Sequence, residues 1–157
     1  MTIKLKLDKN FQPSPVAESD EIYPNGIFHF NITRLLAFIE MHPEDFPLEH
    51  IPVADIPSYA GASLNEATVC SADLSRPVLL AEIAPARYNL IDGHHRVAKA
   101  RRNGVPTVHA RRISCPRHLP FLTTTEAYEK YVEYWNSKVK EMRVVRRRSS
   151  TVSRPTF

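Results

Sequence analysis

The sequence is poor in the features that mark membrane, secreted and fibrous proteins. Its 157 residues include only two cysteines and four glycines, too few for a disulfide scaffold or a collagen-like chain. The longest apolar runs, at residues 77–80 and 83–86, fall far short of the ~20 residues of a membrane span. Residues 1–7 alternate charged with bulky apolar side chains and lack the apolar stretch of a secretion signal. We therefore expect a cytoplasmic protein with no membrane partner.

The two cysteines lack the spacing of a redox or metal motif. Cys70 and Cys115 form no CxxC pair, so we expect inert thiols. An alternative is a nucleophilic Cys115 whose pKa the neighbouring Arg117 lowers, although no motif surrounds it.

Acidic residues are almost absent from two segments. Residues 87–118 hold eight lysines and arginines and one acid, Asp92, whereas residues 143–157 hold five arginines and no acid. The net charge of +4 therefore comes largely from the end of the chain, and a nucleic-acid footprint over the whole protein is not supported. The first segment is expected to face phosphate or another anion. It also carries four histidines, at positions 94, 95, 109 and 118.

The pattern of apolar residues predicts an α/β (α+β) protein, a small mixed sheet with flanking helices. Strands are expected at residues 26–32, 50–56, 77–83, 88–91 and 107–113, and helices at residues 33–41, 94–103 and 123–142. Residues 8–25 are expected to form a loop or wrapped arm. The length suits one domain, with residues 1–142 as its body, a core at about 48–114, and residues 143–157 as a basic, disordered tail.

The predicted helix at residues 123–142 has one apolar and aromatic face, with spacings of three and four. Thr123 and Glu126 match a capping box at its start. We expect this helix to pack on the outside of the sheet; a surface for a partner is the alternative.

The string Asp-Gly-His-His-Arg at residues 92–96 follows a predicted strand and opens a predicted helix. Helix N-termini present unpaired N–H groups and partial positive charge. The amides of Gly93, His94 and His95 are therefore expected to cradle a phosphate, with Arg96 adding a charge-assisted hydrogen bond.

Asp92 is expected either to hold Mg²⁺ or to accept a proton from a hydroxyl group. His94 and His95 are expected to steady a transferring phosphoryl group. Two alternatives stay open: Asp92 only caps the helix, or a metal site joins Asp92 and His94 to a distant His109 or His118.

Residues 76–113 resemble the ParB N-terminal and sulfiredoxin-like nucleotide-binding superfamily. The resemblance lies in Arg-Pro-Val-Leu-Leu at 76–80, the string at 92–96, Gly104 and the strand at 107–113, and it covers roughly residues 48–114. The chain as a whole, including residues 125–138, looks like a group of stand-alone bacterial ParB-like proteins.

Branches of this superfamily differ at the string. Partition proteins carry GERR and sulfiredoxins carry GCHR with a catalytic cysteine, whereas this chain has His94 at that cysteine's position. Free-serine kinases carry DGHHR, which matches residues 92–96 throughout. That resemblance implies a nucleotide held with Mg²⁺ and a glutamate near the first strand as base, a role for which Glu66 and Asp73 are candidates.

The sequence thus predicts a ParB-like protein that binds ATP, ADP or CTP with Mg²⁺. If the protein catalyses a reaction, it acts as an NTP hydrolase or as a kinase for a small-molecule phosphate acceptor. The alternative is a non-catalytic regulatory module that binds a nucleotide or DNA, with the basic tail contributing. A nuclease is not expected, because Asp92 is a lone acid in its segment.

Overall fold

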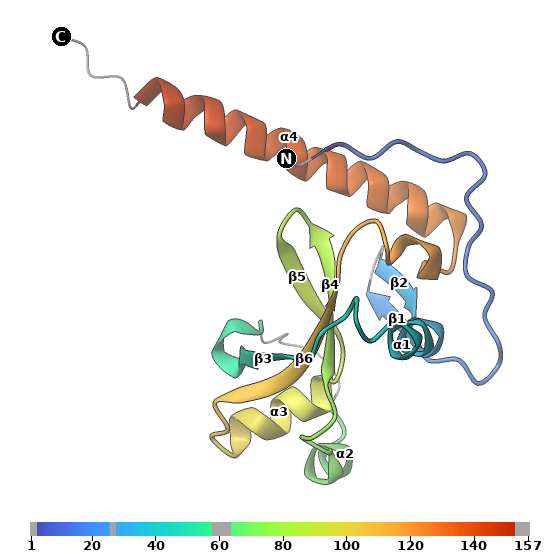
Figure 1. The fold of residues 1–157 in the computed structure, drawn as a ribbon, viewed down its shortest axis with the longest axis vertical. Helices are drawn as coiled ribbons and strands as arrows, with labels where there is room; N and C mark the ends of the chain where they lie inside the picture. The colour runs from blue at the N-terminus through green and yellow to red at the C-terminus, as the bar shows by residue number, and fades with distance from the viewer. Residues whose placement is uncertain (1–2, 26–27, 58–63, 153–157) are drawn as a thin grey trace.

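Two sheets organise the chain, a two-stranded hairpin and a four-stranded mixed sheet (Figure 1). The computed structural model describes residues 3–25, 28–57 and 64–152. The strands are β1 (Ile22–Asn25), β2 (Phe28–Asn31), β3 (Glu49–Pro52), β4 (Val78–Ala84), β5 (Arg87–Asp92) and β6 (Thr107–Ile113). The helices are α1 (Ile32–Met41), α2 (Glu66–Ser71), α3 (His94–Arg102) and α4 (Thr125–Val152), with 3₁₀ turns η1 (Val53–Asp55) and η2 (Leu119–Phe121).

The larger sheet has the strand order β3-β6-β4-β5. Its two central strands, β4 and β6, run parallel, and both edge strands pair antiparallel with them. Strand β4 is almost wholly buried, as expected for an apolar run in the middle of a sheet. The predicted mixed sheet with flanking helices is therefore confirmed.

Side chains alternate between the two faces of this sheet, and each face has its own core. On one face, Val78 and Leu80 pack with Val97 and Ala100 of α3. On the other face, Leu79 and other strand residues pack against α1, the β1–β2 hairpin and α4. The sheet thus separates α3 from α4, which lie at opposite ends of the view in Figure 1.

Helix α4 differs from the expectation at both ends. Thr124 Oγ1 accepts from the Ala127 amide at 3.0 Å, so Thr124 rather than Thr123 caps the helix, and Glu126 pairs with Lys130 instead of closing a capping box. The helix continues to Val152. The predicted disordered tail is therefore wrong for residues 143–152, since arginine favours helix and no glycine or proline intervenes.

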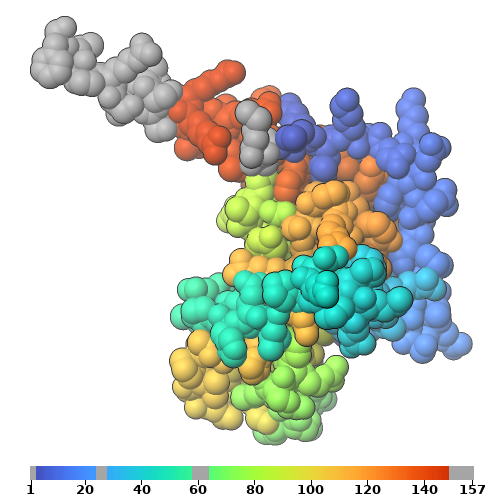
Figure 2. Space-filling model, in the orientation of Figure 1, coloured from blue at the N-terminus to red at the C-terminus, as the bar shows by residue number. Residues whose placement is uncertain are grey.

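Residues 3–11, which include the start of the arm predicted at residues 8–25, follow α4 along part of its length (Figures 1 and 2). Asn136 of α4 exchanges two hydrogen bonds with the backbone of Leu5, at 2.7 and 2.9 Å. Phe11 stacks on Tyr128 with ring centroids 3.9 Å apart. The arm ends sooner than expected, because residues 22–25 form β1.

One helix was not predicted. Helix α2 has only six residues and is capped by Asn65, whose side chain accepts from the amide of Thr68 at 3.2 Å. In the part of the chain that the structure describes, no helix has the length and apolar character needed to cross a lipid bilayer.

Candidate functional site

A cavity of about 380 Å³ opens where β5 ends and α3 begins. Helix α2 and the segment that leads into β4 form its other walls, and Glu21 from the end of the arm reaches its edge. We call this space the α3 cavity. Its charged and titratable lining residues are Glu21, Asp73, Arg76, Asp92, His95 and Arg96. The structure thus brings together residues that lie as much as 75 positions apart in the chain.

Gly93 makes the turn from β5 into α3. Its φ angle is +101°, in the left-handed region that glycine tolerates best. A Cβ atom at this position would lie 2.6 Å from the Cγ1 atom of Val78. Only glycine therefore lets the helix start this close to β4.

Helix α3 begins without a side-chain cap. Gly93 is the N-cap and supplies no side-chain hydrogen bond, so the alternative in which Asp92 only caps this helix is wrong. The Val97 amide donates to the carbonyl of Gly93 at 3.0 Å. Within the described ranges, no acceptor contacts the amides of His95 and Arg96, as the geometry of a helix start implies.

Asp92 and Arg96 form an ion pair. Arg96 Nη2 lies 3.3 Å from Asp92 Oδ2, and the two side chains are only 13% and 12% exposed. Arg96 also donates through Nη1 to the carbonyl of Pro77. Arg96 therefore fixes Asp92 and the start of β4, a role that the sequence analysis did not assign to it.

The two neighbouring histidines diverge. His95 lines the cavity, and its Nε2 atom accepts from the amide of Asn65 at 3.4 Å. His94 stacks instead on Tyr23 of β1, with ring centroids 5.9 Å apart, and it is not among the lining residues. Burial lowers the pKa of His94 below its usual range. The structure therefore brings His95 to the cavity but does not bring His94 there.

Most of the basic segment at residues 87–118 is used inside the protein. Lys99 donates to the carbonyls of Cys70 and Ala72 at 2.9 and 2.8 Å, which ties α3 to the end of α2. Four arginines of this segment bind acidic side chains or backbone carbonyls elsewhere: Arg101, Arg102, Arg112 and Arg117. The expectation that this segment as a whole faces an anion is wrong, because most of its cations have partners within the protein.

Arg76 is the exception among the cavity's cations. It comes from the segment before β4, its side chain is exposed, and it lines the cavity. No ion pair engages it in the described part of the chain. In the sequence Arg76 stands out only as part of the resemblance at residues 76–80, and no role was predicted for it.

Glu21 is the lining acid that the sequence did not predict. The Glu21 amide donates to Thr33 Oγ1 at 2.8 Å, and its carbonyl accepts from the Ile32 amide at 2.8 Å, so the start of α1 holds its backbone. Partial burial and then the charge of Asp92 raise the pKa of Glu21 above its usual range. No signal could have linked these acids, because they lie 71 positions apart.

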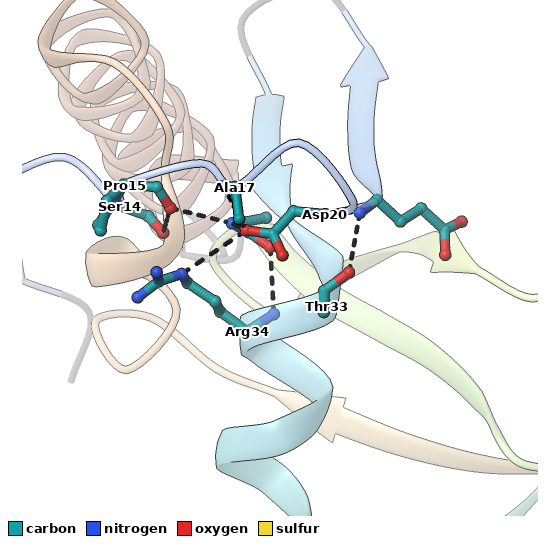
Figure 3. Close-up of polar contacts among 8 residues, drawn as sticks. Ser14, Pro15, Ala17, Asp20, Thr33 and Arg34 are labelled. Atoms are coloured by element: carbon teal, nitrogen blue, oxygen red, sulfur yellow. Dashed lines mark hydrogen bonds and ion pairs between the residues drawn. The ribbon is translucent and has the colours of Figure 1, made fainter.

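A second acid helps to set the position of Glu21. Asp20 accepts hydrogen bonds from the amide of Ala17 and from the side chain of Asn31, each at 2.9 Å (Figure 3). Its Oδ2 atom also lies 3.7 Å from Arg34 Nε. These contacts join the end of the arm to the first turn of α1. The hydrogen bond from Asn31 is the main reason that the pKa of Asp20 lies below its usual range.

The two acids proposed as bases from the sequence differ in position. Asp73 lines the cavity, and hydrogen bonds from the side chain and amide of Ser75 lower its pKa. Glu66 of α2 binds the guanidinium of Arg102 of α3, with its side chain 72% exposed, and is not among the lining residues. The structure therefore does not bring Glu66 to the site.

The metal site that would join Asp92 to distant histidines is not formed. His118 is fully buried and contacts Tyr131 and the carbonyl of Glu82, whereas His109 packs against His50 with ring centroids 4.6 Å apart and the rings tilted. Among the residues that the structure describes, no three His, Cys, Asp or Glu side chains could hold a metal ion. Mg²⁺ fits this donor set only as a phosphate-bound ion, because it is usually held by one or two carboxylates plus phosphate oxygens.

Cys115 does not have the environment of a nucleophile. Burial raises the pKa of Cys115 to about 11, so its thiol is protonated at neutral pH. Arg117, which was considered as an activator of Cys115, pairs instead with Asp45 at 3.1 Å. The nucleophilic alternative is therefore wrong for Cys115.

Comparisons of the chain with protein-family models, with curated proteins and with solved structures gave no match. The mixed α/β fold and the α3 cavity therefore stand on the structure itself. The resemblance at residues 76–113 remains a prediction.

Proposed function

We propose that this protein binds the phosphates of a nucleotide, together with Mg²⁺, in the α3 cavity. The observation that carries the proposal is the cavity itself, which opens at the uncapped start of α3 and is lined by Arg76 and His95. Helix amides, an arginine and a histidine all donate hydrogen bonds to phosphate oxygens. A volume of about 380 Å³ is within the range of small-molecule sites.

The location of this cavity is also what the resemblance to ParB-like and sulfiredoxin-like proteins implies. In that superfamily the string at the start of the helix holds nucleotide phosphates, and here residues 92–96 occupy the same place between a strand and a helix. The ParB-like fold is part of the proposal. The amides of His95 and Arg96 are the phosphate ligands, and ATP, ADP and CTP are the candidate nucleotides.

The two acids at the cavity's edge divide the remaining roles. Asp92, held by Arg96, would supply a carboxylate oxygen to the magnesium ion of the nucleotide, which would balance the phosphate charge. Glu21 has a raised pKa and Asp73 a lowered one, so Glu21 is the better acceptor for the proton of an attacking hydroxyl or water. These roles correspond to a phosphotransferase or an NTP hydrolase.

A second candidate function is a non-catalytic module in which nucleotide binding changes a partner's behaviour. The ion pair between Asp92 and Arg96 favours it, because this carboxylate already has a cationic partner at 3.3 Å. The two functions differ in turnover. In an enzyme, Asp92→Asn abolishes turnover and leaves most nucleotide affinity, whereas a module shows no turnover in the wild type.

A thermal-shift screen tests the shared part of both functions. The full chain is heated with ATP, ADP, CTP or inorganic phosphate, with and without Mg²⁺. A nucleotide at 100 times its Kd adds about 2.7 kcal/mol to the free energy of unfolding, which raises the Tm clearly. If no nucleotide shifts the Tm under any of these conditions, the proposal is wrong.

Matched variants then locate the binding. Arg76→Gln removes the cavity's exposed cation, and Arg87→Gln removes an exposed arginine at the other end of β5. Only Arg76→Gln should reduce the nucleotide-dependent shift. Equal shifts in both variants would place the nucleotide elsewhere.

A further inference from the structure

A second cavity, of about 470 Å³, lies between α4, the turn that joins β4 to β5, and residues 3–5 of the N-terminal segment. We call this space the α4 cavity. It shares no lining residue with the α3 cavity, and Figure 1 shows the β4–β5 turn beside α4 and away from α3. Its volume is within the range of small-molecule sites, and the proposed nucleotide site does not use it.

Residues 3–5 form one wall of the α4 cavity, and two side chains of α4 hold their backbone. Trp135 Nε1 donates to the carbonyl of Ile3 at 3.1 Å. Asn136 accepts from the amide of Leu5 at 2.7 Å and donates to its carbonyl at 2.9 Å. The side chains of Ile3, Leu5 and Trp135 all line the cavity. Because Ile3 is 70% exposed, an apolar ligand in the cavity would remove its side chain from water.

The polar groups of this wall already have partners within the protein. Among the described residues that line the cavity, only Glu82 has a charged side chain. Its two carboxylate oxygens accept from the amides of Cys115 at 3.0 Å and Ala86 at 2.8 Å. Burial raises the pKa of the Cys115 thiol to about 11, so the thiol is neutral. A charged ligand would leave water and find no unengaged partner among these groups, which disfavours it.

We propose that the α4 cavity binds a small, neutral, mainly aliphatic molecule, of the class of a medium-chain alcohol. Its methylene groups would pack against the ring of Trp135 and the side chains of Ile3 and Leu5, and the removal of this apolar surface from water would supply the affinity. Each methylene group that enters the cavity should strengthen binding by about fourfold.

The fluorescence of Trp135 provides the test, because this residue is the only tryptophan of the chain. The full chain is titrated with hexanol, heptanol and octanol. Each alcohol should shift the emission to shorter wavelength in a saturable way as it replaces water at the ring, and the Kd should fall by about fourfold for each added methylene group. Octanoate and octylammonium carry a charge on a chain of the same length and should bind about tenfold more weakly than octanol or worse.

A matched pair of cysteine variants locates the binding. Cys115→Met places a larger side chain in the wall of the α4 cavity, whereas Cys70→Met makes the same change at an exposed cysteine that does not line it. Only Cys115→Met should weaken octanol binding, by about tenfold, since the added atoms occupy part of the cavity. The nucleotide-dependent Tm shift should be the same in Cys115→Met as in the wild type, so the two sites are tested separately.

A second measurement leaves the wall of the cavity unchanged and decides the matter if Cys115→Met does not fold, as judged by circular dichroism. The variant Cys70→Ser leaves Cys115 as the only cysteine. Octanol at ten times its Kd should slow the alkylation of Cys115 by N-ethylmaleimide about tenfold, because only about one cavity in ten stays empty.

Any of four outcomes would overturn the proposal. Octanol produces no saturable change in the emission of Trp135; octanoate or octylammonium binds as tightly as octanol; a folded Cys115→Met variant binds octanol as tightly as Cys70→Met does; or octanol does not slow the alkylation of Cys115. None of these outcomes bears on the nucleotide site, whose own test uses the nucleotide-dependent Tm shift.

Discussion

The two faces of the four-stranded sheet are built from different residues. The face toward α4 buries large aromatic side chains, including Phe30, Tyr131 and Trp135. The face toward α3 buries only aliphatic side chains, with Tyr88 at its margin. Because aromatic residues bury the largest area, the α4 face should contribute more to stability.

The faces also differ in how they treat polar groups. On the α4 side, Tyr131 donates to the carbonyl of Glu82 at 2.8 Å and contacts Nε2 of the buried His118, so polar groups there are enclosed and pair within the core. At the edge of the α3 side, charged groups gather around an open cavity. Substitutions on the first side should therefore change stability, and substitutions on the second should change ligand binding.

The largest expected effect tests the difference in packing. Trp135 is 6% exposed, and its Nε1 atom donates to the carbonyl of Ile3 at 3.1 Å. Trp135→Ala should lower the free energy of unfolding by about 3–5 kcal/mol, whereas Val97→Ala on the α3 face should cost about 2 kcal/mol. Urea unfolding measures both losses of free energy. Equal losses, or a larger loss for Val97→Ala, would contradict the claim that the α4 face contributes more to stability.

The next effect depends on pH. Burial lowers the pKa of His118 to about 4, so between that value and its ordinary pKa of about 6.5 the unfolded chain binds one more proton than the folded chain. The free energy of unfolding should therefore fall as the pH drops through this window, by about 1.4 kcal/mol per pH unit.

Urea unfolding at several pH values checks this, with His118→Phe as the comparison. In that variant Tyr131 still donates to the carbonyl of Glu82, and no group at position 118 titrates. The variant should lose this part of the pH dependence. If its profile is parallel to that of the wild type, His118 is not the group responsible.

Two glycines give a smaller, matched pair of effects at the start and end of α3. Gly93→Ala meets both a positive φ and Val78 at 2.6 Å, whereas Gly104→Ala meets a positive φ and no atom within 4 Å. The first should cost about 2–3 kcal/mol and the second about 1 kcal/mol. Thermal unfolding measures both, and equal losses would mean that contact with Val78 does not require a glycine.

The smallest effect on stability should accompany a large effect on binding. Arg76→Gln should leave the free energy of unfolding within about 0.5 kcal/mol of the wild type, because this side chain is exposed. It should weaken binding of the magnesium nucleotide by about tenfold, the loss of one charge-assisted hydrogen bond. Titration calorimetry checks the affinity. A loss of stability without a loss of affinity would mean that Arg76 is structural.

Local patterns predicted most of the fold. The strand at residues 107–113 and the helices at about 33–41 and 94–103 follow the apolar period and the turn residues closely. The prediction failed where short-range signals are weak or misleading. Helix α2 has only six residues, and the arginine-rich end of α4 resembles a disordered tail in composition although it is helical.

Only those parts of the candidate site that consecutive residues form could be predicted from the sequence. The turn at Gly93 and the start of α3 follow from the local sequence. The position of Glu21 at the cavity and the pairing of Asp92 with Arg96 depend on tertiary packing, as does the contact of His94 with Tyr23. The sequence of a basic segment likewise does not show which of its arginines have partners elsewhere in the folded protein.

The most direct test of the central claim follows the backbone amides of α3 by NMR while a nucleotide and Mg²⁺ are added to the full chain. The account predicts that the amides of His95 and Arg96 show the largest chemical-shift changes, because they would donate to phosphate oxygens. Arg76→Gln should reduce those changes at the same nucleotide concentration. If these two amides stay unchanged while the nucleotide binds, the phosphates lie elsewhere and the claim is wrong.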